Sequence, residues 1–394
     1  MKYKTKDKLS KKLHMYYVFR VMTTLNFLAP VFMLFLLDIG LSSFQVFVAQ
    51  AAYMMAEMLL MVPAGAFADK FGRKKTLIVS NVVYAGSFLL YARADSFLDV
   101  MVVELLFAFC AATFCGAVDA FLYDMLVEAK QEKSYRSVLG TVYALQGVMS
   151  AAASLAGGWL ARYDLSLPFL MSAVPASLSM VPLLMLKEPE RQKQEDASML
   201  KLMKDAALFV AQHRKVRNVL YYVAFTGVAG FVGWMLLQPM LTEMGMKVEY
   251  LGVVMMLSGL ARAAGSKLAS EFEKKLGKLD LLLVTAGFKA VLYLLVYLAS
   301  GYYLVAWVLL LDLVGGLAAP LVSEQVNRHS KSENRATVLA LSSMSGSLAV
   351  SVLSPMFGLY VDAYSEQAAY LLMALMLGAY SARQLLVLMV AKKA

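Results

Sequence analysis

Gly65-Ala66-Phe67-Ala68-Asp69-Lys70-Phe71-Gly72-Arg73-Lys74-Lys75 is a basic, glycine-punctuated turn that lies between two long apolar segments. Apolar segments of about 20 residues are long enough to cross roughly 30 Å of hydrocarbon as helices. The rest of the chain has the same character, since 60% of its 394 residues are hydrophobic, only 16% are charged and the mean hydropathy is +0.65. The composition therefore predicts an all-α integral membrane protein.

Twelve apolar segments have the length of a membrane-spanning helix. They are Tyr16 to Asp38, Phe44 to Ala68, Thr76 to Tyr91, Phe97 to Tyr123, Val138 to Ala161, Pro168 to Leu186, Val219 to Leu241, Leu251 to Phe272, Leu279 to Leu298, Tyr302 to Glu324, Ala336 to Tyr360 and Ala368 to Val390. An even number of spans places the two termini on the same side of the membrane.

The basic residues of the loops gather on that side. The opposite loops contain only three lysines or arginines, namely Arg93, Arg162 and Lys247. Because cytoplasmic loops carry an excess of basic residues, we expect both termini in the cytoplasm. The net charge of +10 then reflects topology and contact with anionic membrane lipids, and we expect no nucleic-acid partner. The first apolar segment is too long for a cleavable signal peptide, so we expect it to remain.

One long polar interruption divides the chain into two halves of six spans each. We expect an N-terminal bundle over residues 1–186, a cytoplasmic linker over 187–217 and a C-terminal bundle over 218–394. Within the linker, apolar residues share one face of a helix that Ser198 would cap, which predicts an interfacial amphipathic helix. The halves repeat at an offset near 200 residues, because Ser154 and Gly158 match Ser354 and Gly358. These matches predict a duplicated six-helix unit.

The basic turn has the spacing of a known signature. Glycine, aspartate four residues later, then glycine followed by basic residues is the pattern of Gly65, Asp69, Gly72, Arg73 and Lys74. With twelve spans around it, the chain resembles the major facilitator superfamily of secondary transporters, and in particular bacterial drug exporters.

The resemblance implies two pseudo-symmetric six-helix bundles that transport by alternating access in the inner membrane of a bacterial cell. It also implies a cytoplasmic gate in which Asp69 and Arg73 join Asp124 at the end of the fourth span. Arg136 and Arg335, which precede corresponding spans in the two halves, are assigned to the same gate. The alternative for the basic residues is that they only anchor the topology.

Charged side chains inside the spans are the strongest indication of a transport site, because each costs about 2.5 to 3.5 kcal/mol to insert. Glu57 is the preferred proton-coupling residue, since it shares a polar helix face and burial favours a carboxyl that loads and releases a proton. The alternative is a permanently protonated Glu57 that only bonds neighbouring helices. Glu104 is a candidate substrate ligand, and Asp119 has a transport role or a structural role beside Asp124.

The second half carries Arg262, Lys289 and Asp312 at comparable depth. We expect Asp312 to neutralise one of the two cations, and the resemblance ranks Arg262 and Asp312 above Lys289 because their spans line the cavity in the family. Arg20 and Arg383 lie near span ends and are expected to extend to the membrane surface. Polar and aromatic side chains along several spans are expected to line the cavity, namely Gln50, Tyr53, Tyr143, Gln146, Tyr222, Trp234 and Gln238.

The sequence therefore predicts a proton-coupled exporter of lipophilic or cationic compounds of the multidrug type. The alternatives are transport of one specific small metabolite and flipping of a lipid or glycolipid. Neither a nucleophile constellation nor a phosphate-binding motif is present in the sequence, so we expect no enzymatic activity. We expect a monomer that needs no cofactor, and no metal site, because Cys110, Cys115 and the three histidines lack metal-ligand spacing.

Overall fold

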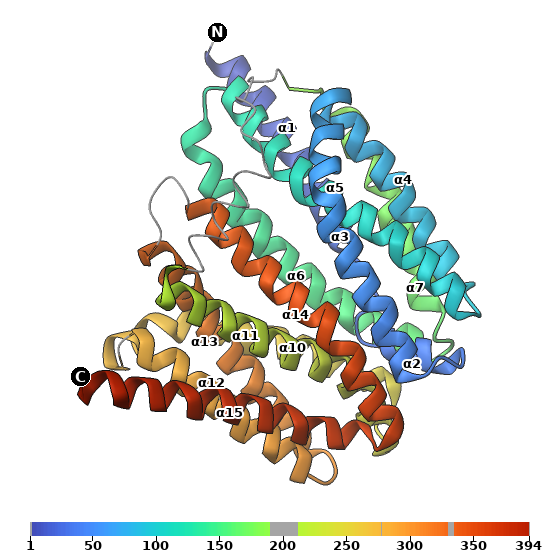
Figure 1. The fold of residues 1–394 in the computed structure, drawn as a ribbon. Helices are drawn as coiled ribbons and strands as arrows, with labels where there is room; N and C mark the ends of the chain where they lie inside the picture. The colour runs from blue at the N-terminus through green and yellow to red at the C-terminus, as the bar shows by residue number, and fades with distance from the viewer. Residues whose placement is uncertain (1, 190–211, 277, 330–334, 394) are drawn as a thin grey trace. The chain divides into compact units, whose positions relative to one another are not determined.

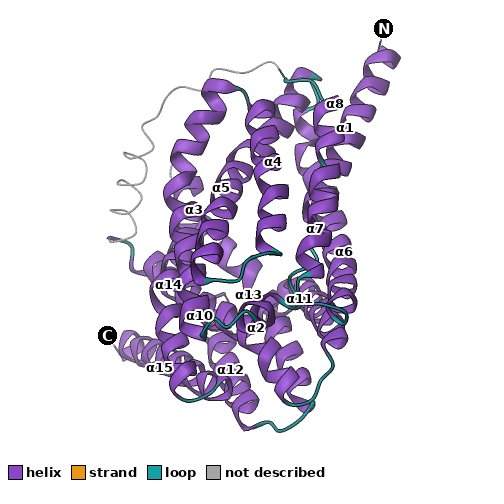
Figure 2. Ribbon diagram, turned by 90° about the vertical axis from the view of Figure 1, so that its right-hand side faces the viewer, coloured by secondary structure: helices purple, strands orange, loops and turns teal. Residues whose placement is uncertain are grey.

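The computed structural model describes residues 2–189, 212–276, 278–329 and 335–393. Within these ranges every regular element is a helix, and Figure 2 shows helices joined by short loops. The helices are α1 (Lys2–Thr24), α2 (Phe32–Asp38), α3 (Ser43–Phe71), α4 (Arg73–Tyr91), α5 (Phe97–Glu128), η1 (Glu132–Ser134), α6 (Tyr135–Ala161), α7 (Leu167–Leu178), α8 (Met180–Met185), α10 (Arg214–Glu243), α11 (Val248–Leu276), α12 (Lys278–Leu298), α13 (Tyr303–His329), α14 (Arg335–Ala363) and α15 (Glu366–Lys393). The predicted amphipathic helix of the linker lies outside the described residues.

The chain is a multi-pass membrane protein. Among the described residues, 10 helical segments are long and apolar enough to cross a membrane. They correspond to ten of the twelve expected spans. The other two are the first expected span, which is interrupted, and α4, which begins with three consecutive basic residues at Arg73.

The prediction of one continuous helix from Tyr16 to Asp38 is wrong. The helix α1 ends at Thr24 and α2 begins at Phe32. Pro30 explains the interruption, because proline has no backbone N–H and disfavours the helical conformation of the residue before it. The exposed backbone finds partners in the neighbouring helices, where the Phe27 N–H donates to Ser172 Oγ at 2.8 Å.

The sixth expected span, Pro168 to Leu186, is also two helices. The helices α7 and α8 meet at Ser179, whose hydroxyl donates to the Ala176 carbonyl at 2.7 Å. Asn81 on α4 donates to Ser179 Oγ at 2.8 Å, so the polar groups at this junction are bonded inside the membrane. Junctions of this kind are tolerated in hydrocarbon where neighbouring helices satisfy the freed backbone groups.

Contacts between residues divide the chain into two compact units. Unit 1 comprises Met1–Leu41, Ala52–Asp196 and Val248–Met255, and unit 2 comprises Ser42–Ala51, Ala197–Lys247 and Met256–Ala394. The units follow the two halves of the sequence, except that the first turns of α3 and α11 each belong to the unit of the other half. Both α3 and α11 are therefore shared between the units.

Unit 1 has a core of large apolar side chains from α1, α5 and α6. Tyr16, Phe19 and Phe121 are nearly inaccessible to solvent and pack with smaller residues of α4 and α8. The helices α4 and α5 lie side by side (Figure 1). The opening turns of α11 pack on α6 so closely that a Cβ on Gly158 would lie 2.8 Å from the Gly252 nitrogen. Only glycine allows two helix backbones to approach this closely.

Unit 2 has its own core, formed around the buried Tyr222 of α10. The helices α12 and α15 run side by side (Figure 1), and α10 packs along α14. At the other end of α14, the Asp362 carboxylate accepts hydrogen bonds from the Ser43 N–H at 2.8 Å and the Phe44 N–H at 3.0 Å. A carboxylate in this position satisfies the free N–H groups of the first turn of α3 and favours its dipole.

Candidate functional site

The basic turn between α3 and α4 is held by an arginine and an aspartate from different helices. The Arg73 guanidinium pairs with the Asp124 carboxylate of α5 and donates to the Ala120 carbonyl at 2.8 Å. Both side chains are largely buried. A charge-assisted contact of this kind fixes the first turn of α4 against α5. The structure thus brings together the two residues that the family resemblance assigned to one gate.

A third residue of the turn was not expected from the sequence. Glu188 follows α8, and its carboxylate accepts hydrogen bonds from the Arg73 N–H at 2.8 Å and the Lys74 N–H at 2.9 Å. The Lys74 ammonium donates to the Leu184 carbonyl at 2.8 Å. Gly72 has φ +107°, a conformation that favours glycine, and a Cβ there would lie 3.3 Å from Glu188 Oε2.

The other members of the predicted gate lie at the ends of their helices. Asp69 is in the last turn of α3 and is exposed, and Arg136 is exposed near the start of α6. The space beside Gly65 is open. Arg335 begins α14, and its side chain lies outside the described atoms.

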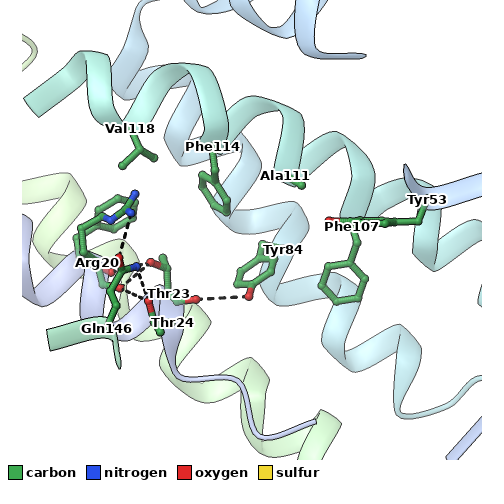
Figure 3. Close-up of a pocket in the computed structure, with 11 residues that line it drawn as sticks. Arg20, Thr23, Thr24, Tyr53, Tyr84, Phe107, Ala111, Phe114, Val118 and Gln146 are labelled. Carbon is green, nitrogen blue, oxygen red and sulfur yellow. Dashed lines mark hydrogen bonds between the residues drawn. The ribbon is translucent and has the colours of Figure 1, made fainter. Parts of the chain in front are cut away.

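Unit 1 encloses a cavity of about 290 Å³ between α1, α3, α4, α5 and α6 (Figure 3). Its walls have an aromatic part and a polar part. The aromatic part contains Tyr53, Tyr84, Phe107 and Phe114, and the polar part contains Arg20, Thr23, Thr24 and Gln146. Phe19, Ala111 and Val118 complete the lining. Two residues that were predicted as lining, Tyr53 and Gln146, lie in these walls.

A chain of hydrogen bonds organises the polar part. Arg20 Nη2 donates to Gln146 Oε1 at 3.3 Å, Gln146 Nε2 donates to Thr24 Oγ1 at 2.6 Å, and Thr24 Oγ1 donates to the Arg20 carbonyl at 2.8 Å. The Arg20 side chain is thus directed at the cavity, and the expectation that it extends to the membrane surface is wrong. Its depth in the sequence looked terminal because the preceding turns of α1 extend the helix beyond the apolar segment.

Glu57 and Asp119 lie near this cavity without forming its wall. Glu57 is half-buried on α3, one helical turn from Tyr53, and the two side chains are hydrogen bonded. Asp119 follows the lining residue Val118 on α5, and its Oδ1 atom is buried without a hydrogen-bond partner among the described residues. Neither carboxylate forms an ion pair with a described basic residue.

Glu104 has a different position from the one expected of a substrate ligand. Its side chain is 3% exposed, and its carboxylate accepts a hydrogen bond from the Tyr91 hydroxyl at 2.8 Å. Tyr91 is surrounded by the rings of Phe32, Phe35 and Phe169 at centroid distances of 4.9 to 6.1 Å. In this structure Glu104 therefore contacts the core of unit 1 and not the cavity.

In unit 2 the two preferred charged residues are paired. Arg262 of α11 forms an ion pair with Asp312 of α13. The helices cross closely at this point, since a Cβ on Gly316 would lie 2.0 Å from the Arg262 carbonyl oxygen. Lys289 of α12 lies beside the pair, because a Cβ on Gly315 would be 3.9 Å from its Nζ atom. The expectation that Asp312 neutralises one of two cations agrees with this geometry, and the cation is Arg262.

The remaining residues of the expected cavity lining are distributed between core and surface. Tyr222 and Gln238 are buried in unit 2, where Tyr222 Oη and Thr285 Oγ1 are 3.0 Å apart. Gln50 is buried and Trp234 is partly buried, whereas Tyr143 is 55% exposed. Tyr222 is therefore a core residue, because the face that it shares with Thr226 packs against α12 and α15.

The fold and the sequence agree with one family. The model of the Major Facilitator Superfamily matches residues 17–354. The chain belongs to this superfamily. Its members include an uncharacterized MFS-type transporter, YxaM, of Bacillus subtilis, which is 21% identical over 89% of this chain and 88% of its own length.

Two further relatives carry names that refer to resistance. The class H tetracycline resistance protein of Pasteurella multocida is 22% identical over 80% of this chain and 78% of its own length. Multidrug resistance protein 1 of Bacillus subtilis is 27% identical over 36% of each chain.

Among solved structures, the nucleoside transporter NupG has a TM-score of 0.79 at 15% or lower identity and is covered over 98% of its length. This chain is covered over 95%. A bacterial homologue of the lysosomal transporter Spinster, in an inward-facing and unoccupied conformation, has a TM-score of 0.73 at 15% identity, with 96% of this chain and 94% of the other covered. These likenesses show the transporter fold.

Proposed function

We propose that this chain is a proton-coupled exporter of lipophilic compounds that works by alternating access in a bacterial inner membrane, with both termini in the cytoplasm. The observation that carries the proposal is the cavity of unit 1, where four aromatic side chains face one hydrogen-bonded polar group. Small-molecule sites are concave and mostly apolar, with few polar groups that fix orientation. The family and the two relatives named for resistance support export over uptake.

Glu57 is the proposed proton carrier. It lies one turn from Tyr53, which is part of the cavity wall, so a change in the cavity reaches it through a single hydrogen bond. A half-buried carboxyl without a basic partner is stabilised as the neutral acid when dry and as the anion when wet. Alternation between the two would link proton movement to opening and closing of the cavity.

The geometry favours the lipophilic substrates of the sequence-based expectation over the cationic ones. The cationic part depended on Glu57 and Glu104 as counter-charges, and Glu104 is buried against Tyr91. The charged group of the cavity wall is Arg20. A lipophilic cation would have to approach this guanidinium.

A second candidate is transport of one specific small metabolite. The bonded chain of Arg20, Gln146 and Thr24 favours it, because a defined polar group discriminates between substrates more strongly than an apolar wall does. The two candidates differ in substrate range, since an exporter of the multidrug type accepts unrelated lipophilic compounds.

The test is substrate-driven proton release from everted membrane vesicles that have been acidified inside by respiration. Addition of N-phenyl-1-naphthylamine, a neutral lipophilic compound, should raise the fluorescence of an acridine pH probe in vesicles with the native chain. Glu57→Gln should reduce this response about 10-fold at matched protein level. Glu132→Gln, on the exposed η1, is the matched control and should behave as the native chain does. A native response equal to that of empty vesicles, for this compound and for unrelated lipophilic compounds, would contradict the proposal.

A further inference from the structure

The cavity of unit 1 holds a charge that the described residues do not neutralise. Arg20 makes one side-chain hydrogen bond, to Gln146 Oε1 at 3.3 Å, and its Nε atom is buried without a partner. It forms no ion pair with a described carboxylate. A guanidinium has five N–H donors, so most of its hydrogen-bonding capacity is unused.

The surroundings hold this guanidinium in place. Gln146 presents its carbonyl oxygen to Arg20 because its amide nitrogen is engaged by Thr24 Oγ1 at 2.6 Å. Thr24 in turn donates to the Arg20 carbonyl at 2.8 Å, one helical turn away. Gln146 is on α6 and the other two are on α1, so the fork of donors is fixed by two helices. Figure 3 shows the three side chains together at one end of the cavity.

The opposite part of the cavity is built for a planar apolar group. Tyr84 makes edge-to-face contacts with Phe107 and with Phe114, each at 5.7 Å between ring centroids. The Tyr84 hydroxyl donates to the Thr23 carbonyl at 3.4 Å, so this polar atom is already engaged. Ring edges and faces that surround a gap favour stacking of another aromatic ring.

We propose that the ligand of this site is a small aromatic anion, whose acidic group pairs with Arg20 and whose ring lies between Tyr84, Phe107 and Phe114. This inference rests on the proposed transport function and names the substrate class of the same cavity. A planar carboxylate matches the guanidinium fork with two parallel hydrogen bonds, and it supplies the counter-charge that Arg20 lacks. A volume of about 290 Å³ suits a body of one or two fused rings. A cation of the same shape is repelled by the same side chain.

The experiment compares three ligands with one ring system and different charge: 1-naphthoate, the neutral 1-naphthamide and the cationic 1-naphthylmethylammonium. Equilibrium binding to the purified full chain in lipid nanodiscs is measured by isothermal titration calorimetry. The native chain should bind the anion at least 10-fold more tightly than the amide, and the cation most weakly. Equal affinity for all three, or a preference for the cation, would overturn the inference without any variant.

Variants then locate the site. Arg20→Gln should remove the preference for 1-naphthoate and leave 1-naphthamide binding within about 2-fold, which also shows that the variant folds. Arg20→Lys should retain part of the preference, because an ammonium attracts the anion but lacks the fork. Phe114→Ala should weaken all three ligands by a similar factor. Arg162→Gln, an exposed arginine after α6, is the control and should change nothing.

Binding and transport fail separately in these tests. Anion-selective binding that depends on Arg20, together with vesicles in which 1-naphthoate causes no proton release, would retain the site and reject proton-coupled export. Proton release by neutral lipophilic compounds, together with binding that does not depend on Arg20, would retain export and overturn the anion site.

Discussion

The two units of the chain treat charges within their helices in opposite ways. In unit 2, Arg262 and Asp312 form an ion pair at a close crossing of α11 and α13. In unit 1, Arg20, Glu57 and Asp119 lie in or beside a cavity and form no ion pair with any described residue. Both arrangements are costly to insert into a membrane, but only the first is compensated within the protein.

The difference indicates a division of labour between the halves. A compensated pair between two closely packed helices has its interactions satisfied whether or not a ligand is bound, so it acts as a brace. An uncompensated arginine and two carboxylates gain partners only when a solute or a proton arrives. The half that duplicated the fold has therefore kept the charge but changed its use, and three substitutions measure how far this contrast holds.

The largest effect is expected from Gly316→Ala, which strikes the crossing beside the ion pair of unit 2. The added methyl group would lie 2.0 Å from the Arg262 carbonyl oxygen, so the helices must separate. We expect a loss of about 3 kcal/mol in unfolding free energy, the upper part of the range for overpacked cores. The apparent unfolding temperature of the purified protein in detergent measures it.

The adjacent glycine supplies the control for this substitution. A Cβ on Gly315 meets only the Lys289 ammonium, at 3.9 Å, which is an ordinary contact. Gly315→Ala should be neutral or slightly stabilising, since alanine is the better helix former by about 1 kcal/mol. Equal behaviour of the two variants would mean that the close crossing is absent from the protein in solution.

A smaller effect is expected from Arg262→Gln, which leaves Asp312 without its partner. The Asp312 side chain is 16% exposed, but that of Arg262 is 67% exposed, so solvent weakens the pair. We expect a loss of about 1 kcal/mol in unfolding free energy. The double variant Arg262→Gln and Asp312→Asn should recover most of it, because no charge is then stranded. A double variant less stable than the single one would show that the pair is not a brace.

The smallest effect on stability, and of opposite sign, is expected from Asp119→Asn in unit 1. Its buried Oδ1 atom has no described partner, so removal of the negative charge should leave the unfolding free energy unchanged or raise it by up to about 1 kcal/mol. The rate of substrate-driven proton release should nevertheless fall if the charge serves transport. Destabilisation as large as that of Arg262→Gln would erase the contrast between the units.

Most of the fold could be predicted from the sequence, because length and apolarity of a span depend on the span alone. The interruption of the first span was the exception, although Pro30 was visible. A proline can be tolerated in a membrane helix or can end it, and the outcome here depends on partners for the freed backbone, such as Ser172 on α7. Such partners are known only once the helices are packed.

The candidate site was less predictable for the same reason. Tyr53 and Gln146 were found from polar stripes, since a stripe is a local pattern. Arg20 was assigned to the membrane surface and Glu104 to the cavity, because distance along a helix does not show which neighbour a side chain meets. The partner of Glu104 is Tyr91, on α4, and no spacing rule relates the two.

The carboxylate of Glu188 bears on how such proteins are recognised in genomes. It reads the main chain of Arg73 and Lys74, so this contact places no demand on which side chains follow Gly72, whereas the glycine and the distant acid are both constrained. A signature written from the contiguous letters of the turn records the residues that are free to drift in this contact and omits one that is not. A profile that couples the turn to an acid just beyond the sixth span would describe the inherited unit more completely.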